Sequence, residues 1–198
     1  QGIPLNPKPK PIPLHTEPAP IPIKSRLPGS DMTPLDSRGP SGPSPKTFVS
    51  AVWNHAARAG AELGVPPHAL VAQAALETGW GKREIRLPDG SPSYNVFGIK
   101  AGADWPGKIA ETTTTEYVNG VPQTRVARFR AYDSYAAAFQ DYATLLKNSP
   151  RYAHALQAAD GPQFAAALQR AGYATDPAYA AKLSRVMASE TLRQAMLA

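Results

Sequence analysis

Proline is distributed so unevenly along this chain that it limits where a folded domain can lie. Thirteen of the 22 prolines fall within residues 1–45, including the alternating run at 7–11. Proline lacks a backbone N–H, and dense proline favours extended polyproline II structure over helix or sheet. We therefore predict that residues 1–45 form a largely disordered linker and that residues 46–198 form the folded domain.

The composition limits the partners and the chemistry. About 150 residues are enough for one hydrophobic core. A net charge of +6 at pH 7 favours an anionic partner such as nucleic acid, acidic lipid or a carboxylate-bearing cell wall. The absence of cysteine excludes disulfides and a cysteine nucleophile. No apolar run approaches the ~18 residues of a membrane helix. No signal peptide follows Gln1, so export would require a longer chain or another route.

Hydrophobic periodicity predicts a mostly helical domain. The segment 68–78 is apolar on nearly all sides, which is typical of a helix at the centre of a core. Gly79 and Gly81 are stop signals behind it, and Asp133 and Asp176 are candidates to cap two later helices. Helices are expected at 47–63, 68–78, 134–147, 162–171 and 176–197.

A β-hairpin is predicted around Asn119-Gly120, a dipeptide that favours a two-residue turn. The turn sets a register in which Pro122 faces Tyr117 at a non-hydrogen-bonded pair, where proline's missing N–H costs nothing. The strands are expected at 109–118 and 121–130. The predicted fold class is therefore α+β, mostly helical with one β-hairpin lobe.

Several kinds of site have no support in the sequence. The chain lacks a phosphate-binding loop, a dinucleotide fingerprint and a nucleophile elbow, and its charge is not accompanied by a nucleic-acid-binding motif. We predict no metal, no cofactor and no nucleic-acid partner. The four histidines are scattered without metal-binding spacing: His15, His55, His68 and His154.

Glu77 is the acid best placed for chemistry. It lies near the end of the apolar segment, with Leu70 and Ala74 on its own face of the predicted helix. Burial and the negative end of the helix dipole both disfavour a charged carboxylate there, so we expect a raised pKa. A carboxyl group that stays protonated suits general acid catalysis of glycoside hydrolysis, although a structural glutamate would have the same pattern.

Two other acids are candidates for a second catalytic carboxyl. In the predicted register Glu111 faces Arg128 and forms a cross-strand ion pair, whereas Glu116 faces Gln123 and lacks an opposed cation. Glu116 is thus either a second catalytic acid or a solvated surface charge. Asp141, at the edge of an apolar helix stripe, is its rival or another surface charge.

Aromatic rings are candidates for a sugar platform, because rings stack on the apolar faces of pyranoses. The same residues are also expected in a core. The candidates are Trp80, Tyr94, Phe97, Trp105, Tyr152 and Tyr173.

Four segments together resemble glycoside hydrolase family 73. They match the family in order and spacing, and the resemblance covers roughly residues 46–198. The segments are AALETGWG at 74–81, NVFGIK at 95–100, FRAYDS at 129–134 and AGYATDP at 171–177.

The resemblance implies a lysozyme-like fold and an endo-acting β-N-acetylglucosaminidase. Such an enzyme cuts the bond between N-acetylglucosamine and N-acetylmuramic acid in peptidoglycan glycan strands. The family's catalytic residues fall on Glu77, Glu116 and Tyr173. Glu77 would protonate the glycosidic oxygen, Glu116 would act as base or charge stabiliser, and Tyr173 would hydrogen-bond the N-acetyl group or the water. The predicted substrate-binding residues are Trp80, Asn95, Phe97 and Tyr152.

Within that family the chain is most similar to the hydrolase domain of a flagellar rod-assembly protein. This implies a bacterial, exported protein in the periplasm or cell wall. Flagellar rod proteins would be partners through a domain preceding residue 1. A substrate-assisted route stays open, as do a lytic transglycosylase, a muramidase and a non-catalytic peptidoglycan-binding module.

Overall fold

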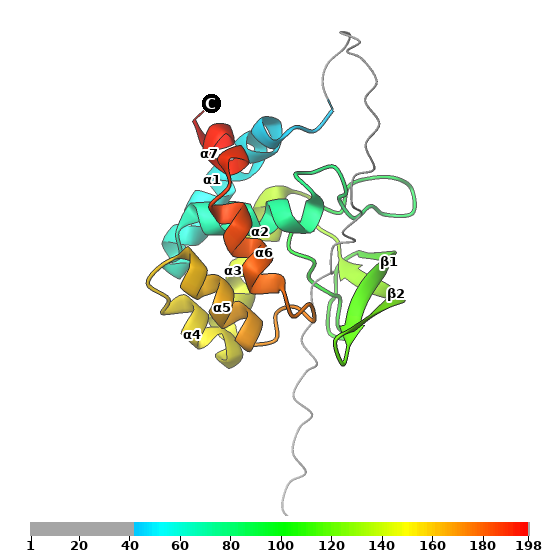
Figure 1. The fold of residues 1–198 in the computed structure, drawn as a ribbon. Helices are drawn as coiled ribbons and strands as arrows, with labels where there is room; N and C mark the ends of the chain where they lie inside the picture. The colour runs from blue at the N-terminus through cyan, green and yellow to red at the C-terminus, as the bar shows by residue number, and fades with distance from the viewer. Residues whose placement is uncertain (1–41, 198) are drawn as a thin grey trace, which may run out of the picture.

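The structure is a computed structural model that describes residues 42–197. The helices gather into one lobe and a two-stranded antiparallel sheet stands apart as a second (Figure 1). This confirms the predicted α+β class. The elements are α1 (Pro45–Leu63), α2 (Pro67–Thr78), β1 (Ile109–Val118), β2 (Val121–Arg130), α3 (Tyr135–Asn148), the 3-10 helix η1 (Pro150–Tyr152), α4 (Ala153–Leu156), α5 (Gly161–Arg170), α6 (Tyr179–Met187) and α7 (Glu190–Met196).

The beginning of α1 lies at the predicted domain boundary. Ser44 accepts a hydrogen bond from the Thr47 amide at 3.2 Å, and Thr47 Oγ1 accepts one from the Ser44 amide at 2.9 Å, which forms a capping box. The helix therefore begins at Pro45, two residues before the predicted start. The predicted linker lies outside the described residues except for 42–45, and it stays a prediction.

The apolar helix α2 is the centre of the helical lobe, as predicted. Nine of its 12 residues are buried, and it packs against both α1 and α6 (Figure 1). It begins at Pro67, which suits a first turn because the first N–H groups of a helix have no intrahelical partner. It ends at Gly79, which takes the left-handed conformation with φ 56°.

The hairpin has the predicted strands and register. Tyr117 pairs with Pro122 and Glu111 pairs with Arg128. The Tyr117 amide points away from β2 and donates to Thr175 Oγ1 at 3.1 Å, as expected at a non-hydrogen-bonded pair. Residues 99–101 continue the pairing on the outer edge of β2, and a small apolar cluster fills the base of this lobe: Ile85, Ala110, Ala127 and Phe129.

Three predicted features of the helices are wrong. The single helix at 176–197 is two helices, because Ser189 stops α6 by donating to the Val186 carbonyl at 2.7 Å and caps α7 through the Leu192 amide. Ser134, not Asp133, caps α3. Asp176 does not cap α6, which begins after Ala178. The short helices η1 and α4 were not predicted.

We predict that Gly60→Ala destabilises the protein, although alanine normally favours a helix over glycine by about 1 kcal/mol. The chain folds back over Gly60 at the end of α1, and a Cβ there would lie 2.5 Å from the Val65 carbonyl oxygen. Overpacking of this kind costs about 1–3 kcal/mol. Thermal unfolding should show a lower Tm for Gly60→Ala. Ser50→Ala, at an exposed position of the same helix, should change little. An unchanged or raised Tm for Gly60→Ala would contradict this packing.

Candidate active site

The turn after α2 fixes the position of Glu77. Thr78 Oγ1 donates to the Ala74 carbonyl at 2.8 Å and accepts from the Gly81 amide at 3.0 Å. Gly79 and Trp80 both take positive φ, so the chain leaves the helix sharply. Glu77 is thereby held in the last turn of a buried helix rather than on a loop.

The carboxyl group of Glu77 lies in a site that disfavours charge. Glu77 as a whole is 8% exposed, and its Oε2 atom is buried without a hydrogen-bond partner among residues 42–197. Burial raises the pKa of Glu77 well above its ordinary value, as predicted. A protonated Glu77 therefore has an O–H that the protein does not need for its own hydrogen bonds.

A cluster of buried tyrosines packs near Glu77 and is organised by Gln73, one helical turn earlier. Gln73 Nε2 donates to the Tyr179 hydroxyl at 3.0 Å, and the Tyr142 hydroxyl donates to Gln73 Oε1. Burial raises the pKa of Tyr142, Tyr173 and Tyr179, and the charge of Glu77 contributes to each shift. The four groups thus share one low-dielectric region.

Tyr173 belongs to this cluster, which brings it into the electrostatic environment of Glu77. Its hydroxyl donates to the Phe97 carbonyl at 2.7 Å, and its ring stacks on Tyr179 with centroids 5.6 Å apart. The residue is 2% exposed. In this conformation the hydroxyl is held by the protein, and its proposed contact with substrate stays a prediction.

Glu116 is not an unpaired acid. It forms an ion pair with Lys100, and both side chains are mostly shielded from solvent. The prediction that Glu116 faces Gln123 and has no directly opposed cation is confirmed, but residues 99–101 supply a partner from outside the two strands. The adjacent Tyr117–Thr175 hydrogen bond joins the hairpin to the loop between α5 and α6, which reaches toward it (Figure 1).

Asp141 is engaged in holding α3 against the base of β2. Its Oδ2 atom accepts from Arg130 Nη1 at 3.0 Å and from the Tyr132 hydroxyl at 2.5 Å. The Arg130 guanidinium also lies 4.8 Å from the centroid of the Trp105 ring. These contacts favour a structural role over that of a second catalytic acid.

Three predicted substrate-binding side chains are buried. Asn95 braces its loop by bonding both the Ile99 carbonyl and the Arg130 carbonyl at 2.8 Å. Phe97 stacks on Tyr142 at 3.8 Å, and both Phe97 and Tyr152 are 1% exposed. None of the three presents a surface to a sugar in this conformation, in which they pack and brace the loop, and their contact with substrate stays a prediction. Trp80 is partly exposed and remains the candidate platform.

Sequence reasoning missed Gln73, Tyr142, Tyr179 and Lys100. Gln73 had a signal, since it is a polar residue four positions before Glu77 in an otherwise apolar helix. Lys100 lies inside the NVFGIK segment, but nothing local indicates its ion pair. Within residues 42–197 no cluster of three or more His, Cys, Asp or Glu side chains is arranged to hold a metal. No helix in that range is long and apolar enough to cross a membrane.

A helical lobe, a separate hairpin and a buried, protonatable glutamate at the end of the central helix are features of glycosidases that work by general acid catalysis. Comparison with known proteins agrees. The model of the glucosaminidase family, described as mannosyl-glycoprotein endo-beta-N-acetylglucosaminidase, matches residues 53–192. The chain belongs to this family, and it is a glycosidase with a lysozyme-like α+β fold.

Similar proteins extend this assignment. The peptidoglycan hydrolase FlgJ of Salmonella typhimurium is 50% identical over 155 residues, which cover 78% of this chain and 49% of that protein. The chain thus spans about half the length of that relative. A peptidoglycan hydrolase mutant from Sphingomonas sp. A1 is 60% identical with TM-score 0.75, covering 77% of this chain and 98% of that one. The C-terminally truncated glycoside hydrolase domain of Salmonella typhimurium FlgJ is 48% identical with TM-score 0.61. The match covers 78% of this chain and 99% of that one.

We predict that Glu77→Gln stabilises the protein at neutral pH. Because burial raises the pKa of Glu77, the folded state binds a proton that the unfolded chain releases. The stability from this group is full below its ordinary pKa of 4.5 and is lost as the pH rises through the folded-state pKa. Thermal unfolding of wild type and variant should differ by about 2–4 °C near pH 8, a change on the order of 1 kcal/mol. The difference should shrink near pH 4.

Glu111→Gln, an exposed control, should show no such trend. Parallel pH profiles for wild type and Glu77→Gln would contradict the burial of this carboxyl.

Proposed function

We propose that this domain hydrolyses the glycan strands of peptidoglycan at the bond between N-acetylglucosamine and N-acetylmuramic acid. The single observation that carries the proposal is the buried Glu77 carboxyl, whose Oε2 has no hydrogen-bond partner among the described residues. The names of the relatives, peptidoglycan hydrolases, support the substrate. Action on the cell wall of a bacterium, in the periplasm, follows from that substrate.

Glu77 acts as the general acid in this proposal. Its proton passes to the glycosidic oxygen as the bond from that oxygen to the anomeric carbon breaks. A water then adds to the anomeric carbon, and its proton passes to a second carboxylate. Burial near Gln73 and the tyrosines raises the pKa of Glu77 and so favours the protonated state, which is the state that the first step requires.

Glu116 is our candidate for the second carboxylate. Its strand is joined to the Tyr173 loop through Tyr117 and Thr175, so the hairpin and the Glu77 side of the molecule already meet. The ion pair with Lys100 fixes the position of the Glu116 carboxylate, as a base or stabiliser of positive charge requires. Tyr173 orients the N-acetyl group or the water once substrate displaces its bond to Phe97.

A role in penetration of the cell wall by the flagellar rod is proposed from the similarity to FlgJ. The chain matches about half of that relative, so contacts with flagellar rod proteins would require sequence beyond the matched part. The hydrolytic activity can be tested without it.

We expect wild-type protein to release fragments with N-acetylglucosamine at the reducing end from purified peptidoglycan. Mass spectrometry of borohydride-reduced products identifies that end. Glu77→Gln should be slower by at least about 10²-fold, because it removes the proton donor. Glu116→Gln should also be slow. Glu111→Gln, on the same strand but paired with Arg128 at the surface, should retain normal activity.

Each rival has its own product. An anhydro-sugar end would indicate a lytic transglycosylase, muramic acid at the reducing end would indicate a muramidase, and binding without cleavage would indicate a non-catalytic module. A fully active Glu77→Gln would refute the mechanism. If Glu116→Gln stays active while folded Asp141→Asn is inactive, the second acid is Asp141.

A further inference from the structure

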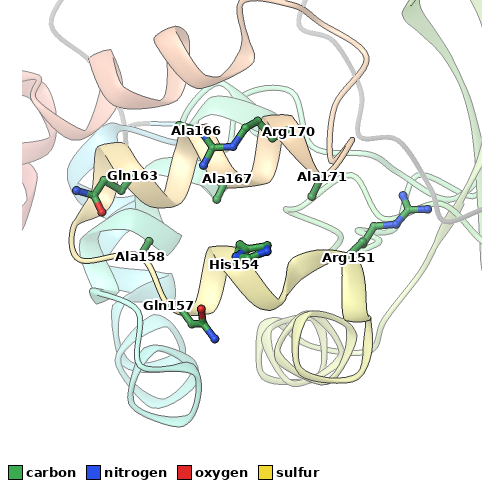
Figure 2. A pocket seen from close by; sticks show the side chains of 9 residues that line it. All are labelled: Arg151, His154, Gln157, Ala158, Gln163, Ala166, Ala167, Arg170 and Ala171. Carbon is green, nitrogen blue, oxygen red and sulfur yellow. The ribbon is translucent and has the colours of Figure 1, made fainter.

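A surface cavity that does not include Glu77 lies between α4 and α5. Its volume is about 740 Å³, which is within the usual range for ligand sites. Figure 2 shows alanines on its walls and longer polar side chains around its margin. Because alanine side chains are short, they leave the hollow between the two helices. We call this cavity the α4–α5 groove.

The α4–α5 groove carries positive charge and no negative charge. Its lining includes Arg151, His154 and Arg170 but no aspartate or glutamate. Within residues 42–197, Arg170 makes no ion pair, so its guanidinium is available to a ligand. Gln157 and Gln163 lie toward the other end of the groove from Arg151 (Figure 2). The groove therefore has positively charged side chains toward one end, of which Arg170 is available to a ligand, and amide groups toward the other.

The cationic end adjoins the loop that holds Tyr173. A Cβ at Gly172 would lie 3.9 Å from Arg151 Nη1, so this guanidinium is beside the residue that precedes Tyr173. Tyr152, next to Arg151, has its ring centroid 6.1 Å from that of Tyr173. A substituent on a glycan bound at the Glu77 site could thus enter the groove from this end.

We propose that the α4–α5 groove binds the carboxylate-bearing peptide stem of peptidoglycan, an inference that rests on the proposed function. The Arg170 guanidinium donates hydrogen bonds to a stem carboxylate, for which its planar shape is well suited. The glutamine amides hydrogen-bond the peptide groups. The groove makes the enzyme prefer glycan that carries peptides over glycan from which they have been removed.

The test compares the whole protein on two substrates, peptide-bearing peptidoglycan and glycan strands freed of peptide by an amidase. Arg170→Ala should raise KM on the peptide-bearing substrate by about three- to fivefold with kcat unchanged, as expected for one exposed charge pair. It should leave both constants unchanged on the bare glycan. Arg185→Ala, which removes an exposed arginine of α6 outside the groove, should match wild type on both substrates.

A second measurement does not depend on catalysis. Soluble stem peptide is titrated into labelled protein, and the amide shifts of residues 151–171 are followed by NMR. Saturable shifts that weaken in Arg170→Ala support the groove. Equal KM changes on both substrates, or no shifts in this range, overturn it. If the peptide binds while neither substrate is cleaved, the proposed function fails and the groove stands. If both substrates are cleaved without peptide preference or shifts, only the groove fails.

Discussion

The desolvation of one carboxyl group is the constraint around which this domain is arranged. Glu77 lies at the end of α2, and α2 is buried against α1 and α6 along most of its length. The same face carries Gln73, whose amide joins the hydroxyls of Tyr142 and Tyr179. A charged glutamate there would forfeit solvation without gaining a hydrogen bond to Oε2, so the protonated form is favoured. In the proposed mechanism, this burial prepares Glu77 to donate a proton.

The remaining elements are tied to one another by a few specific contacts around that acid. Asn95 and Arg130 join the loop after α2 to the base of the hairpin, and Asp141 joins that base to α3. The hairpin then meets the Tyr173 loop through Tyr117 and Thr175. Opening the hairpin would require at least this backbone-to-hydroxyl bond to break, which costs about 1 kcal/mol. The contact is therefore compatible with a hairpin that opens for a glycan and closes over it.

Local signals predicted much of this architecture. The Asn119-Gly120 turn was sufficient for the strands and their register, and the apolar run before Glu77 was sufficient for both the central helix and the raised pKa. These features depend on residues that are close together in the chain. The cap at Ser189 was missed because a long apolar pattern continues across it, even though its hydroxyl ends one helix and begins the next.

The parts of the site that depend on tertiary contacts could not be predicted in this way. Lys100 and Glu116 are 16 positions apart in the sequence, and no local pattern indicates that they pair. Only the folded hairpin brings them together. Phe97 and Asn95 fall in a recognisable segment, which suggested contact with sugar, and Tyr152 was an aromatic candidate for the same role. Their burial indicates that such segments also preserve the packing that positions Tyr173 and the loop after α2.

The measurement that tests the account most directly is an NMR titration of the Glu77 side-chain carboxyl in the free protein. Carboxyl-labelled glutamate gives the signals, and the signal missing from Glu77→Gln identifies this group. The account predicts a pKa well above the ordinary 4.5, with the group still largely protonated where exposed glutamates have ionised. A Glu77 that titrates at or below the ordinary value would mean that the carboxyl is solvated or paired, and the general-acid mechanism would lose its physical basis.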